Sequence, residues 1–413
     1  MKTRNFYDTS DPEKLLLLKR QESVALLEVI RSINVARINL TRIFKIAKNT
    51  LLAQLGVRRM SFIFQKYGNY FTEMNHRIAD PTPEVLEELP ITPGIMEVDP
   101  IDYPFLTREG VEYVIPFLYG DGIGAWIMVA EFAESEEEKR NDLIFIETLG
   151  NVLVVALENA EFVNNKVKQE AIRRELEVAE NIQKQLLPTN HSQIRSADIF
   201  AVNVSHDRVG GDFYDVVSWG ERGFFICIAD VSGKGIAAAL LMANILSNLR
   251  ALIVSEDHLE PLIRKLNQNV FQITQGEKFV TLFLGHIRAN DGEIDYINAG
   301  HNDPLLIRSG SEEVESLSTG STILGAFEEL PFATQATLSY QSGDLLFLYT
   351  DGLVEQTNHS EELLGEEEVI RALNKCEDMT AKEVVTEINQ LYKNHAGEVT
   401  AEDDITMMAV RFK

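Results

Sequence analysis

Residues 228–235 read Ile228-Ala229-Asp230-Val231-Ser232-Gly233-Lys234-Gly235, and the apolar run Phe224-Phe225-Ile226-Cys227-Ile228 leads directly into them. Such a run predicts a buried strand, and the glycines that follow predict a tight turn at its end. Asp230 therefore stands where a strand ends, and we expect its carboxylate to point into a cleft and not into a core.

Acidic residues recur at the ends of apolar runs in three other segments of the C-terminal half. These are Val209-Gly210-Gly211-Asp212-Phe213-Tyr214-Asp215, Leu348-Tyr349-Thr350-Asp351-Gly352 and Glu402-Asp403-Asp404-Ile405-Thr406. Carboxylates without cysteine or paired histidine suit hard ions such as Mg²⁺ or Mn²⁺. Two such ions can activate a water and clamp a phosphoryl oxygen, which predicts phosphate ester hydrolysis. A single Asp-Gly is usually only a turn, so this interpretation depends on all four segments occurring together.

The remaining C-terminal sequence alternates apolar strands with helical blocks. Helices are expected at 236–254, 258–273 and 366–396, the first beginning directly after the Asp230 loop. Strands are expected at 224–228, 280–284, 294–297, 345–349 and 407–412. Strands grouped around long helices predict an α/β sandwich whose loops carry the functional residues.

The N-terminal part predicts a separate α+β domain. Apolar residues at spacings of three and four favour a helix over residues 13–56, and residues 143–149 favour a second one. Strands are expected at 60–64, 113–118 and 126–130, with a hairpin turn at Tyr119-Gly120-Asp121-Gly122. This order of elements is typical of a compact α+β domain.

Residues 152–187 predict one long linker helix that Pro188 ends. Its apolar residues form a narrow and imperfect seam between charged positions, which favours a two-stranded coiled coil between protomers, with a stutter. The alternative is a helix that lies against its own catalytic domain. We therefore divide the chain into domains at 1–151, 152–189 and 190–413.

Composition limits the class of protein. The chain has 413 residues, enough for two or three domains, and a formal charge of −26 from 38 basic and 64 acidic residues, which argues against nucleic acid as a general partner. Only two cysteines, Cys227 and Cys376, are present, as expected in a reducing compartment. The N-terminus resembles no signal peptide, and we expect no membrane-spanning stretch, so a cytoplasmic location without direct membrane insertion is predicted.

The C-terminal half resembles the PPM (protein phosphatase 2C-like) superfamily in its bacterial SpoIIE/RsbU-type branch, whose fold is an αββα sandwich. The resemblance rests on six segments matched in order. They are Ile182-Gln183-Lys184-Gln185-Leu186-Leu187-Pro188, Gly210-Gly211-Asp212-Phe213-Tyr214-Asp215, Ala229-Asp230-Val231-Ser232-Gly233-Lys234-Gly235, Asn298-Ala299-Gly300-His301-Asn302, Tyr349-Thr350-Asp351-Gly352 and Glu402-Asp403-Asp404-Ile405-Thr406.

The resemblance implies a protein Ser/Thr phosphatase with two divalent cations, Mn²⁺ or Mg²⁺, and a metal-activated water. One ion is expected on Asp212, Asp230 and the backbone carbonyl of Val231. The other is expected on Asp230, Asp351 and Asp403. Two further residues follow from the same match: Asp404 as a supporting residue or alternate ligand, and Asp215 as a supporting residue through a hydrogen bond or a metal-bound water.

Three other residues are candidates for substrate binding. Arg208 lies near the position where eukaryotic members carry a phosphate-binding Arg, although this branch often lacks it. His301 stands close to where those members have an Asp for a third ion, and it is a proton donor, a support of the site or a structural residue. Lys234 is not the lysine of a nucleotide-binding loop, because the upstream glycine spacing is absent, and we interpret it as a loop or substrate-contact residue.

The N-terminal domain resembles a GAF sensory domain, with an α+β dimerisation module that binds no ligand as the alternative. The family resemblance implies a phosphorylated STAS-type anti-sigma-factor antagonist as the protein substrate. It also implies regulation through the linker helix, a homodimer through that helix, and a small-molecule or protein signal at the GAF-like domain.

Two other functions are alternatives to a phosphatase. Gly210-Gly211-Asp212-Phe213 is similar to the signature of diguanylate cyclases, but it lies near the start of its domain, and a cyclase has no need of the Asp351 and Asp403 loops. The second alternative is a catalytically inactive regulator that binds a phosphoprotein. The presence of all four core acidic residues argues against it.

Overall fold

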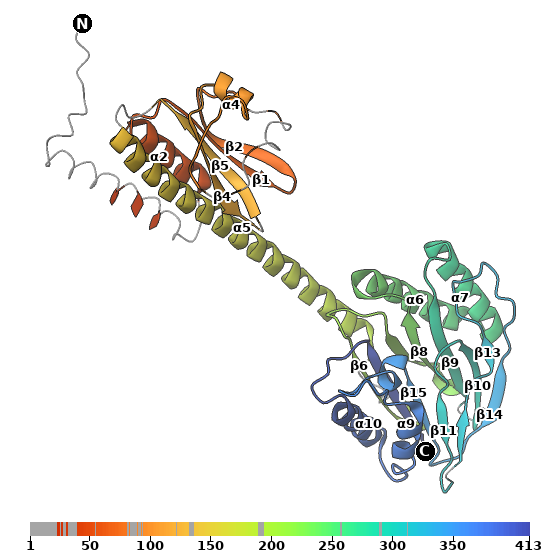
Figure 1. Ribbon diagram of the computed structural model, residues 1–413. Helices are drawn as coiled ribbons and strands as arrows, with labels where there is room; N and C mark the ends of the chain where they lie inside the picture. Colours follow the sequence, from red (N-terminus) through yellow and green to blue (C-terminus); the bar gives the residue numbers. More distant parts are fainter. Residues whose placement is uncertain are drawn as a thin grey trace. The chain divides into compact units, whose positions relative to one another are not determined.

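The computed structural model describes residues 39–413 with short gaps, together with a few positions between residues 23 and 31 (Figure 1). The gaps are residues 54, 81, 83–88, 90–91, 93, 121, 132–135, 189–193, 257, 289–290 and 312. The chain forms two compact units, Met1–Ala171 and Ile172–Lys413. The division falls inside the predicted linker. About half of the helix predicted over 13–56 lies outside the described residues, and residues 40–53 of it are helical in the structure.

The first unit combines an antiparallel sheet with helices, as the α+β prediction requires. The sheet has the order β2-β1-β5-β4-β3. Its elements are α2 (Leu40–Ala53), β1 (Arg59–Lys66), β2 (Asn69–His76), β3 (Met96–Glu97), α4 (Pro104–Arg108), β4 (Tyr113–Tyr119) and β5 (Gly122–Ala130). β1, β4 and β5 match predicted strands, and β4 and β5 form the predicted hairpin. β2 and β3 were not predicted; in β2 most residues are exposed or half-buried, so hydrophobic alternation is weak there.

Alternating side chains of this sheet build two apolar layers. Phe62 of β1 packs with α2 and the first part of α5, whereas its neighbour Ile63 packs on the opposite face with Trp126 and Leu106. Successive strand residues point to opposite faces, which explains why two adjacent large side chains are both buried. The sheet is therefore covered on both sides.

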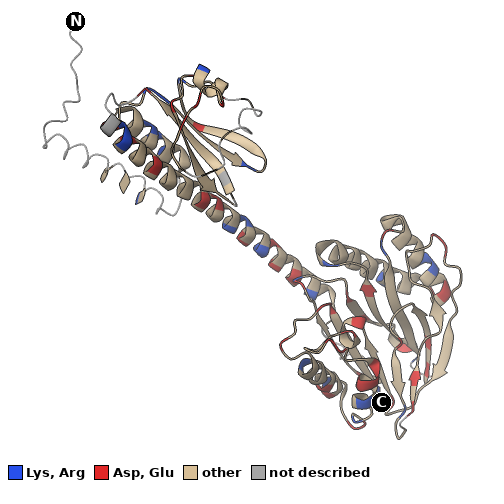
Figure 2. Cartoon of the chain, viewed as in Figure 1, with Lys and Arg blue, Asp and Glu red and all other residues tan. Residues whose placement is uncertain are grey.

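The helices predicted at 143–149 and 152–187 are one helix, α5 (Glu136–Leu186). No proline interrupts these residues, and the helix ends two residues before Pro188. Several apolar side chains in its second half are exposed, among them Phe162, Val167 and Ile182. Figure 2 shows acidic and basic residues interspersed along this part of α5.

The second unit is a sandwich of two sheets. One sheet has the order β13-β10-β9-β8-β7, with β14 paired to β10, and the other has the order β12-β11-β15-β16-β6. The strands of the first are β7 (Phe213–Ser218), β8 (Gly223–Val231), β9 (Val280–Arg288), β10 (Glu293–Ala299), β13 (Gly320–Ser321) and β14 (Ala336–Ser339). Those of the second are β6 (Ala197–Val204), β11 (Leu305–Ile307), β12 (Val314–Ser316), β15 (Leu345–Tyr349) and β16 (Ile405–Phe412).

Helix pairs cover the outer faces of the two sheets and complete an αββα arrangement (Figure 1). α6 (Gly235–Ser255) and α7 (Leu259–Thr274) share a core with the first sheet, and α9 (Glu366–Leu373) and α10 (Ala381–Ala396) share one with the second. Short helices lie at η1 (Gly220–Arg222) and α8 (Asp351–Val354). The five strands and the helices at 236–254 and 258–273 predicted for this half are confirmed.

The single helix predicted over 366–396 is wrong, because residues 374–380 separate α9 from α10. The Thr380 side chain accepts a hydrogen bond from the Glu383 amide, and the Glu383 side chain accepts one from the Thr380 amide. This capping box starts a new helix. The capping residues Thr380 and Glu383 are visible in the sequence, but the prediction of one helix over 366–396 did not take them into account.

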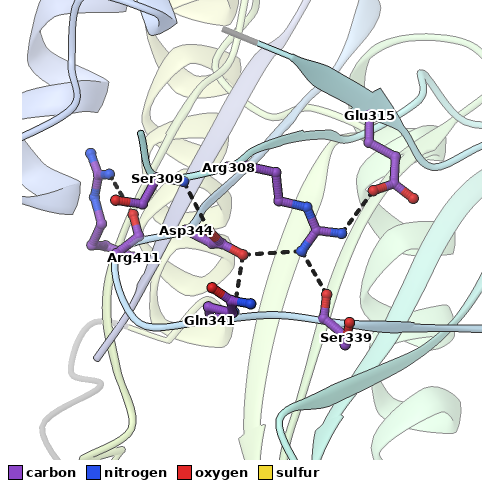
Figure 3. A network of polar contacts seen from close by, with 8 residues as sticks. Arg308, Ser309, Glu315, Ser339, Gln341, Asp344 and Arg411 are labelled. Atoms are coloured by element: carbon purple, nitrogen blue, oxygen red, sulfur yellow. Dashed lines mark hydrogen bonds and ion pairs between the residues drawn. The ribbon is translucent and has the colours of Figure 1, made fainter. Parts of the chain in front are cut away.

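A buried ion pair holds the ends of β11 and β15 together (Figure 3). The Asp344 carboxylate accepts hydrogen bonds from Arg308 Nη1 at 3.0 Å and from the backbone amides of Ser309 and Gln341 at 2.9 and 3.0 Å. Arg308 also donates to Glu315 Oε2 at 2.8 Å, nearer the surface. The Asp344 charge is thus fully satisfied, which a buried carboxylate requires.

Two described helices, Glu138–Leu186 and Gly235–Ser255, are long and apolar enough by length and composition to cross a membrane. The prediction that no stretch of this length and composition occurs does not hold, whereas the predicted absence of membrane insertion is not tested by this finding and stays a prediction. Both helices also supply core residues to their units, and core helices of folded domains meet the same criterion. The finding assigns no membrane role to either.

Candidate metal centre

The four predicted carboxylates stand at one edge of the sandwich. Asp230 lies at the end of β8, and Asp212 immediately precedes β7, its antiparallel neighbour. Asp351 begins α8 directly after β15, and Asp403 precedes β16, which is antiparallel to β15. Because neighbouring antiparallel strands begin and end at the same edge, each sheet contributes two carboxylates there.

Asp212 joins the two sheets. Its side chain is 2% exposed, and its Oδ2 accepts hydrogen bonds from Thr350 Oγ1 at 2.7 Å and Thr406 Oγ1 at 2.8 Å. Both threonines belong to the second sheet or its ends. Burial raises the pKa of the Asp212 carboxyl well above its usual range, and the nearby charge of Asp230 raises it further.

The other carboxylates oppose one another's ionisation. Burial, and then the charge of Asp351, raises the pKa of Asp230 to about 6. Burial, and then the charge of Asp403, raises the pKa of Asp351. A group of like charges in a partly dry site is unfavourable without a counter-charge, and a divalent cation supplies one.

Glycines allow the backbone to approach the carboxylates closely. A Cβ on Gly210 would lie 2.0 Å from Asp404 Oδ2, and one on Gly352 would lie 2.1 Å from the Asp404 carbonyl oxygen. A Cβ on Gly211 would lie 2.6 Å from the Val231 carbonyl oxygen, the backbone oxygen predicted as a ligand. These three positions have no room for a side chain.

Asp404 is engaged by the backbone. Its Oδ1 accepts a hydrogen bond from the His206 amide and its Oδ2 one from the Gly211 amide, both at 2.8 Å. The Asp404 amide in turn donates to Asp403 Oδ1 at 2.9 Å. Of the two predicted roles, this arrangement fits a support that fixes the loop before Asp212 better than it fits an alternate ligand.

The Lys234 ammonium lies beside the cluster. Its Nζ is 3.1 Å from Asp403 Oδ2 and donates to the Glu402 carbonyl oxygen at 2.5 Å. Both side chains are about half exposed, so the pair is at the rim of the site. The ion pair raises the pKa of Lys234, which keeps the side chain cationic.

Arg208, His301 and Asp215 do not form one group with Lys234. Each of the three has a partner of its own. The Arg208 guanidinium pairs with Glu177 at 3.2 Å and with Glu180 at 3.8 Å, both on α5. It thus faces the linker helix, which speaks against its predicted contact with substrate phosphate.

His301 is enclosed in the fold and unsuited to the predicted contact with substrate. The residue is 6% exposed, and its Nδ1 lies 2.8 Å from Thr281 Oγ1. Burial lowers the pKa of its imidazole to about 4, so the ring is neutral. Asn298 Nδ2 donates to the His301 carbonyl oxygen, and the His301 amide donates to Asn298 Oδ1, which fixes the turn. The structural interpretation of His301 is the one that these contacts favour.

Asp215 is held by an arginine of helix α6. Arg250 of α6 donates from Nε to Asp215 Oδ2 at 2.7 Å and from Nη2 to Asp215 Oδ1 at 3.1 Å. Arg250 Nη2 also donates to the carbonyl oxygen of Leu186, at the end of α5, at 2.8 Å. Of the two supporting roles predicted for Asp215, a hydrogen bond or a metal-bound water, these contacts fit the hydrogen bond, which joins α5, α6 and β7.

The donor set fits Mg²⁺ or Mn²⁺, since it consists of carboxylates and a backbone carbonyl. Asp212, Asp230 and the Val231 carbonyl would hold one ion, and Asp230, Asp351 and Asp403 the other. Within the described part of the chain, no three His, Cys, Asp or Glu side chains already surround one point as a metal shell.

Sequence reasoning did not single out four residues that organise this site. Thr350 and Thr406 orient Asp212, while Gln183 and Arg250 connect the end of α5 to the same region. Three of them stand within the segments quoted for the family resemblance. Arg250, the one charged residue of α6, is the fourth, and its isolation in an apolar helix was the available signal.

Comparisons with known proteins agree with this geometry. Residues 220–413 match the family described as stage II sporulation protein E (SpoIIE). The chain is 30% identical over 187 residues to phosphoserine phosphatase RsbU of Bacillus subtilis (strain 168), covering 45% of this chain and 55% of that protein. It is 30% identical over 191 residues to phosphoserine phosphatase RsbP of the same organism, covering 45% of this chain and 46% of that protein.

The chain thus spans about half the length of these curated relatives. A solved structure, the SiaA-PP2C domain of Pseudomonas aeruginosa, aligns with a TM-score of 0.53 and 20% identity, covering 60% of this chain and 99% of that domain. At this identity the likeness concerns the fold alone. The C-terminal unit therefore has a PP2C-like phosphatase fold.

Proposed function

We propose that this protein is a metal-dependent phosphatase that removes phosphate from phosphoserine or phosphothreonine of a partner protein in bacterial signalling. The observation that carries the proposal is the meeting of Asp212, Asp230, Asp351 and Asp403 at one edge of a PP2C-like sandwich. The similarity to two phosphoserine phosphatases supports it.

Bound divalent cations would lower the pKa of a water and neutralise charge on the phosphoryl oxygens. The chain's own residues prepare for them. Thr350 and Thr406 both donate to the same oxygen of Asp212, which leaves its other oxygen without a hydroxyl donor from them. Asp404 holds the loop before Asp212 through two backbone amides. Lys234, a cation at the rim, is suited to attract the substrate phosphate.

The finer parts of the proposal concern partners and regulation. By resemblance, the substrate is a phosphorylated STAS-type anti-sigma-factor antagonist, and the first unit is a GAF-like sensory domain. The exposed apolar residues of α5 between Phe162 and Ile182 support a homodimer through a coiled coil. Cys227 and Cys376 are free and buried, which suits a cytoplasmic enzyme.

The test is phosphate release from a phosphoserine protein and from p-nitrophenyl phosphate, with and without Mn²⁺. Metal-dependent turnover is expected in the full chain and is expected to be lost in Asp230→Ala and Asp351→Ala. Binding of a phosphoprotein without turnover would instead establish the inactive regulator. A cyclic product from GTP would establish the nucleotide cyclase, which the PP2C-like fold disfavours.

A further inference from the structure

The end of helix α5 makes direct contact with the loop that precedes Asp212. Gln183 Nε2 donates to the Gly210 carbonyl oxygen at 2.7 Å, and the Gly210 amide donates to Gln183 Oε1 at 3.2 Å. One side-chain amide thus satisfies both backbone groups of a single residue. Gly210 is buried and lies two positions before Asp212.

The opposite side of this loop is held by Asp404. Its carboxylate accepts hydrogen bonds from the His206 and Gly211 amides, and Gly210 packs against it so closely that no Cβ fits. The loop at 206–211 therefore lies between Gln183 on one side and Asp404 on the other. It has little freedom to move while both contacts persist.

The position of this loop sets the position of the Asp212 backbone. The hydroxyls of Thr350 and Thr406 then orient the carboxylate from the second sheet. Loss of the Gln183 contact would leave two buried backbone groups without partners, at a cost that favours rearrangement of the loop. Any such rearrangement displaces Asp212 from its fixed donors.

We infer that Gln183 is a positioning residue of the metal centre: its reciprocal hydrogen bonds with Gly210 hold Asp212 where it pairs with Asp230 to receive an ion. This inference rests on the proposed function and assigns Gln183 no contact with substrate or metal. Arg208 of the same loop also pairs with Glu177 and Glu180, about two turns and one turn earlier on α5.

The arrangement makes the site sensitive to rotation of α5. A helix turns by about 100° per residue, so a rotation of that size removes the Gln183 amide from Gly210. The end of the linker helix is then a support on which the position of Asp212 depends. This supplies a physical route for the regulation proposed above.

The chain offers a matched control for the experiment. Gln185 is the same residue type, two positions further along α5, and its side chain is exposed. We would compare the full-length wild type with Gln183→Ala, Gln183→Met and Gln185→Ala. The first readout is Mn²⁺ affinity by isothermal titration with the metal alone, and the second is amide hydrogen exchange of residues 206–212 without metal.

Loss of a residue that supports a metal ligand typically weakens metal affinity by roughly 10- to 100-fold, so about 10-fold or more is expected for Gln183→Ala. Gln183→Met should weaken it similarly, because the side chain retains its length but not its hydrogen bonds. Gln185→Ala should change affinity less than about two-fold. Exchange of the 206–212 amides should accelerate in both Gln183 variants only.

Unchanged Mn²⁺ affinity and unchanged exchange in both folded Gln183 variants would overturn the inference. An equal loss in Gln185→Ala would overturn it too, since the effect would then belong to the helix in general. Failure of the wild type to bind Mn²⁺ would refute the proposed function instead. In that case the exchange measurement would still decide whether Gln183 holds the loop.

Discussion

The carboxylate cluster should make the metal-free protein less stable as the pH rises. Asp230 has a folded pKa of about 6 against an ordinary value of 3.8, with burial as the main cause and the Asp351 charge as the second. The folded state therefore binds a proton more tightly than the unfolded chain. The contribution of Asp230 to the free energy of unfolding is fully present below pH 3.8 and is lost as the pH rises through about 6.

The size of the effect follows from the shift. A difference of about 2.2 pKa units corresponds to about 3 kcal/mol, since one unit is worth about 1.4 kcal/mol. Asp212, whose pKa is also raised, acts in the same direction. The isosteric substitution Asp230→Asn removes the titrating group and should therefore remove about 2 to 3 kcal/mol of the loss between pH 4 and pH 7.5.

The measurement is urea unfolding of the full chain in EDTA, read by tryptophan fluorescence. The sequence has two tryptophans, Trp126 in the first unit and Trp219 in the second. A Trp126→Phe background lets Trp219 report the second unit alone. The free energies of unfolding of this background and of its Asp230→Asn variant are then compared at each pH, so that the difference reports the loss of Asp230 together with its effect on the pKa of Asp212.

Parallel stability curves for the two proteins would refute the reasoning, because Asp230 would then titrate normally. A divergence in the opposite sense would refute it too. Saturating Mn²⁺ should reverse the trend in the Asp230 protein, since an ion binds the ionised carboxylates and stabilises the folded state by mass action.

Three further outcomes are expected. Gly210→Ala should destabilise the second unit by about 3 kcal/mol in urea unfolding, because its Cβ displaces Asp404 from two backbone amides. The double variant that carries both Gly210→Ala and Asp404→Ala should be no less stable than Asp404→Ala alone. Lys234→Met should tighten Mn²⁺ binding by up to about five-fold in calorimetric titration, because the ammonium no longer competes for Asp403. Asp344→Ala should cost about 3 kcal/mol in urea unfolding, since three hydrogen bonds to a buried charge are lost.

Each of these has an outcome that contradicts it. Additive losses in the double variant would show that Gly210 and Asp404 do not interfere. Weaker Mn²⁺ binding in Lys234→Met would show that Lys234 assists the ion and does not compete with it. For the Arg308–Asp344 pair, Glu315→Ala is the control, because it removes the exposed partner of Arg308 and should cost under about 1 kcal/mol. A loss in Glu315→Ala as large as that in Asp344→Ala would refute the importance of burial.

The sequence by itself determined most elements of the second unit and the chemistry of its site. Apolar runs are local, and those at 224–228, 345–349 and 407–412 are strands in the structure. Acidic residues follow or precede these strands in the sequence. They lie at the same edge because one antiparallel strand ends where its neighbour begins, as in the pairs β7–β8 and β15–β16. Weakly patterned strands such as β2 and the start of α10 were missed, the first for lack of a signal and the second because its cap was overlooked.

Only the tertiary structure decided what each site residue contacts. Arg208, Asp215 and His301 were predicted from the sequence to belong to the site, yet their partners are Glu177, Arg250 and Thr281. Thr350 reaches Asp212 across 138 residues of chain, and Asp404 reaches the amide of Gly211 across 193. Such contacts depend on strand register and on how two sheets pack, which hydrophobic periodicity does not encode. Residue pattern set the kind of chemistry, and long-range packing set which side chains take part in it.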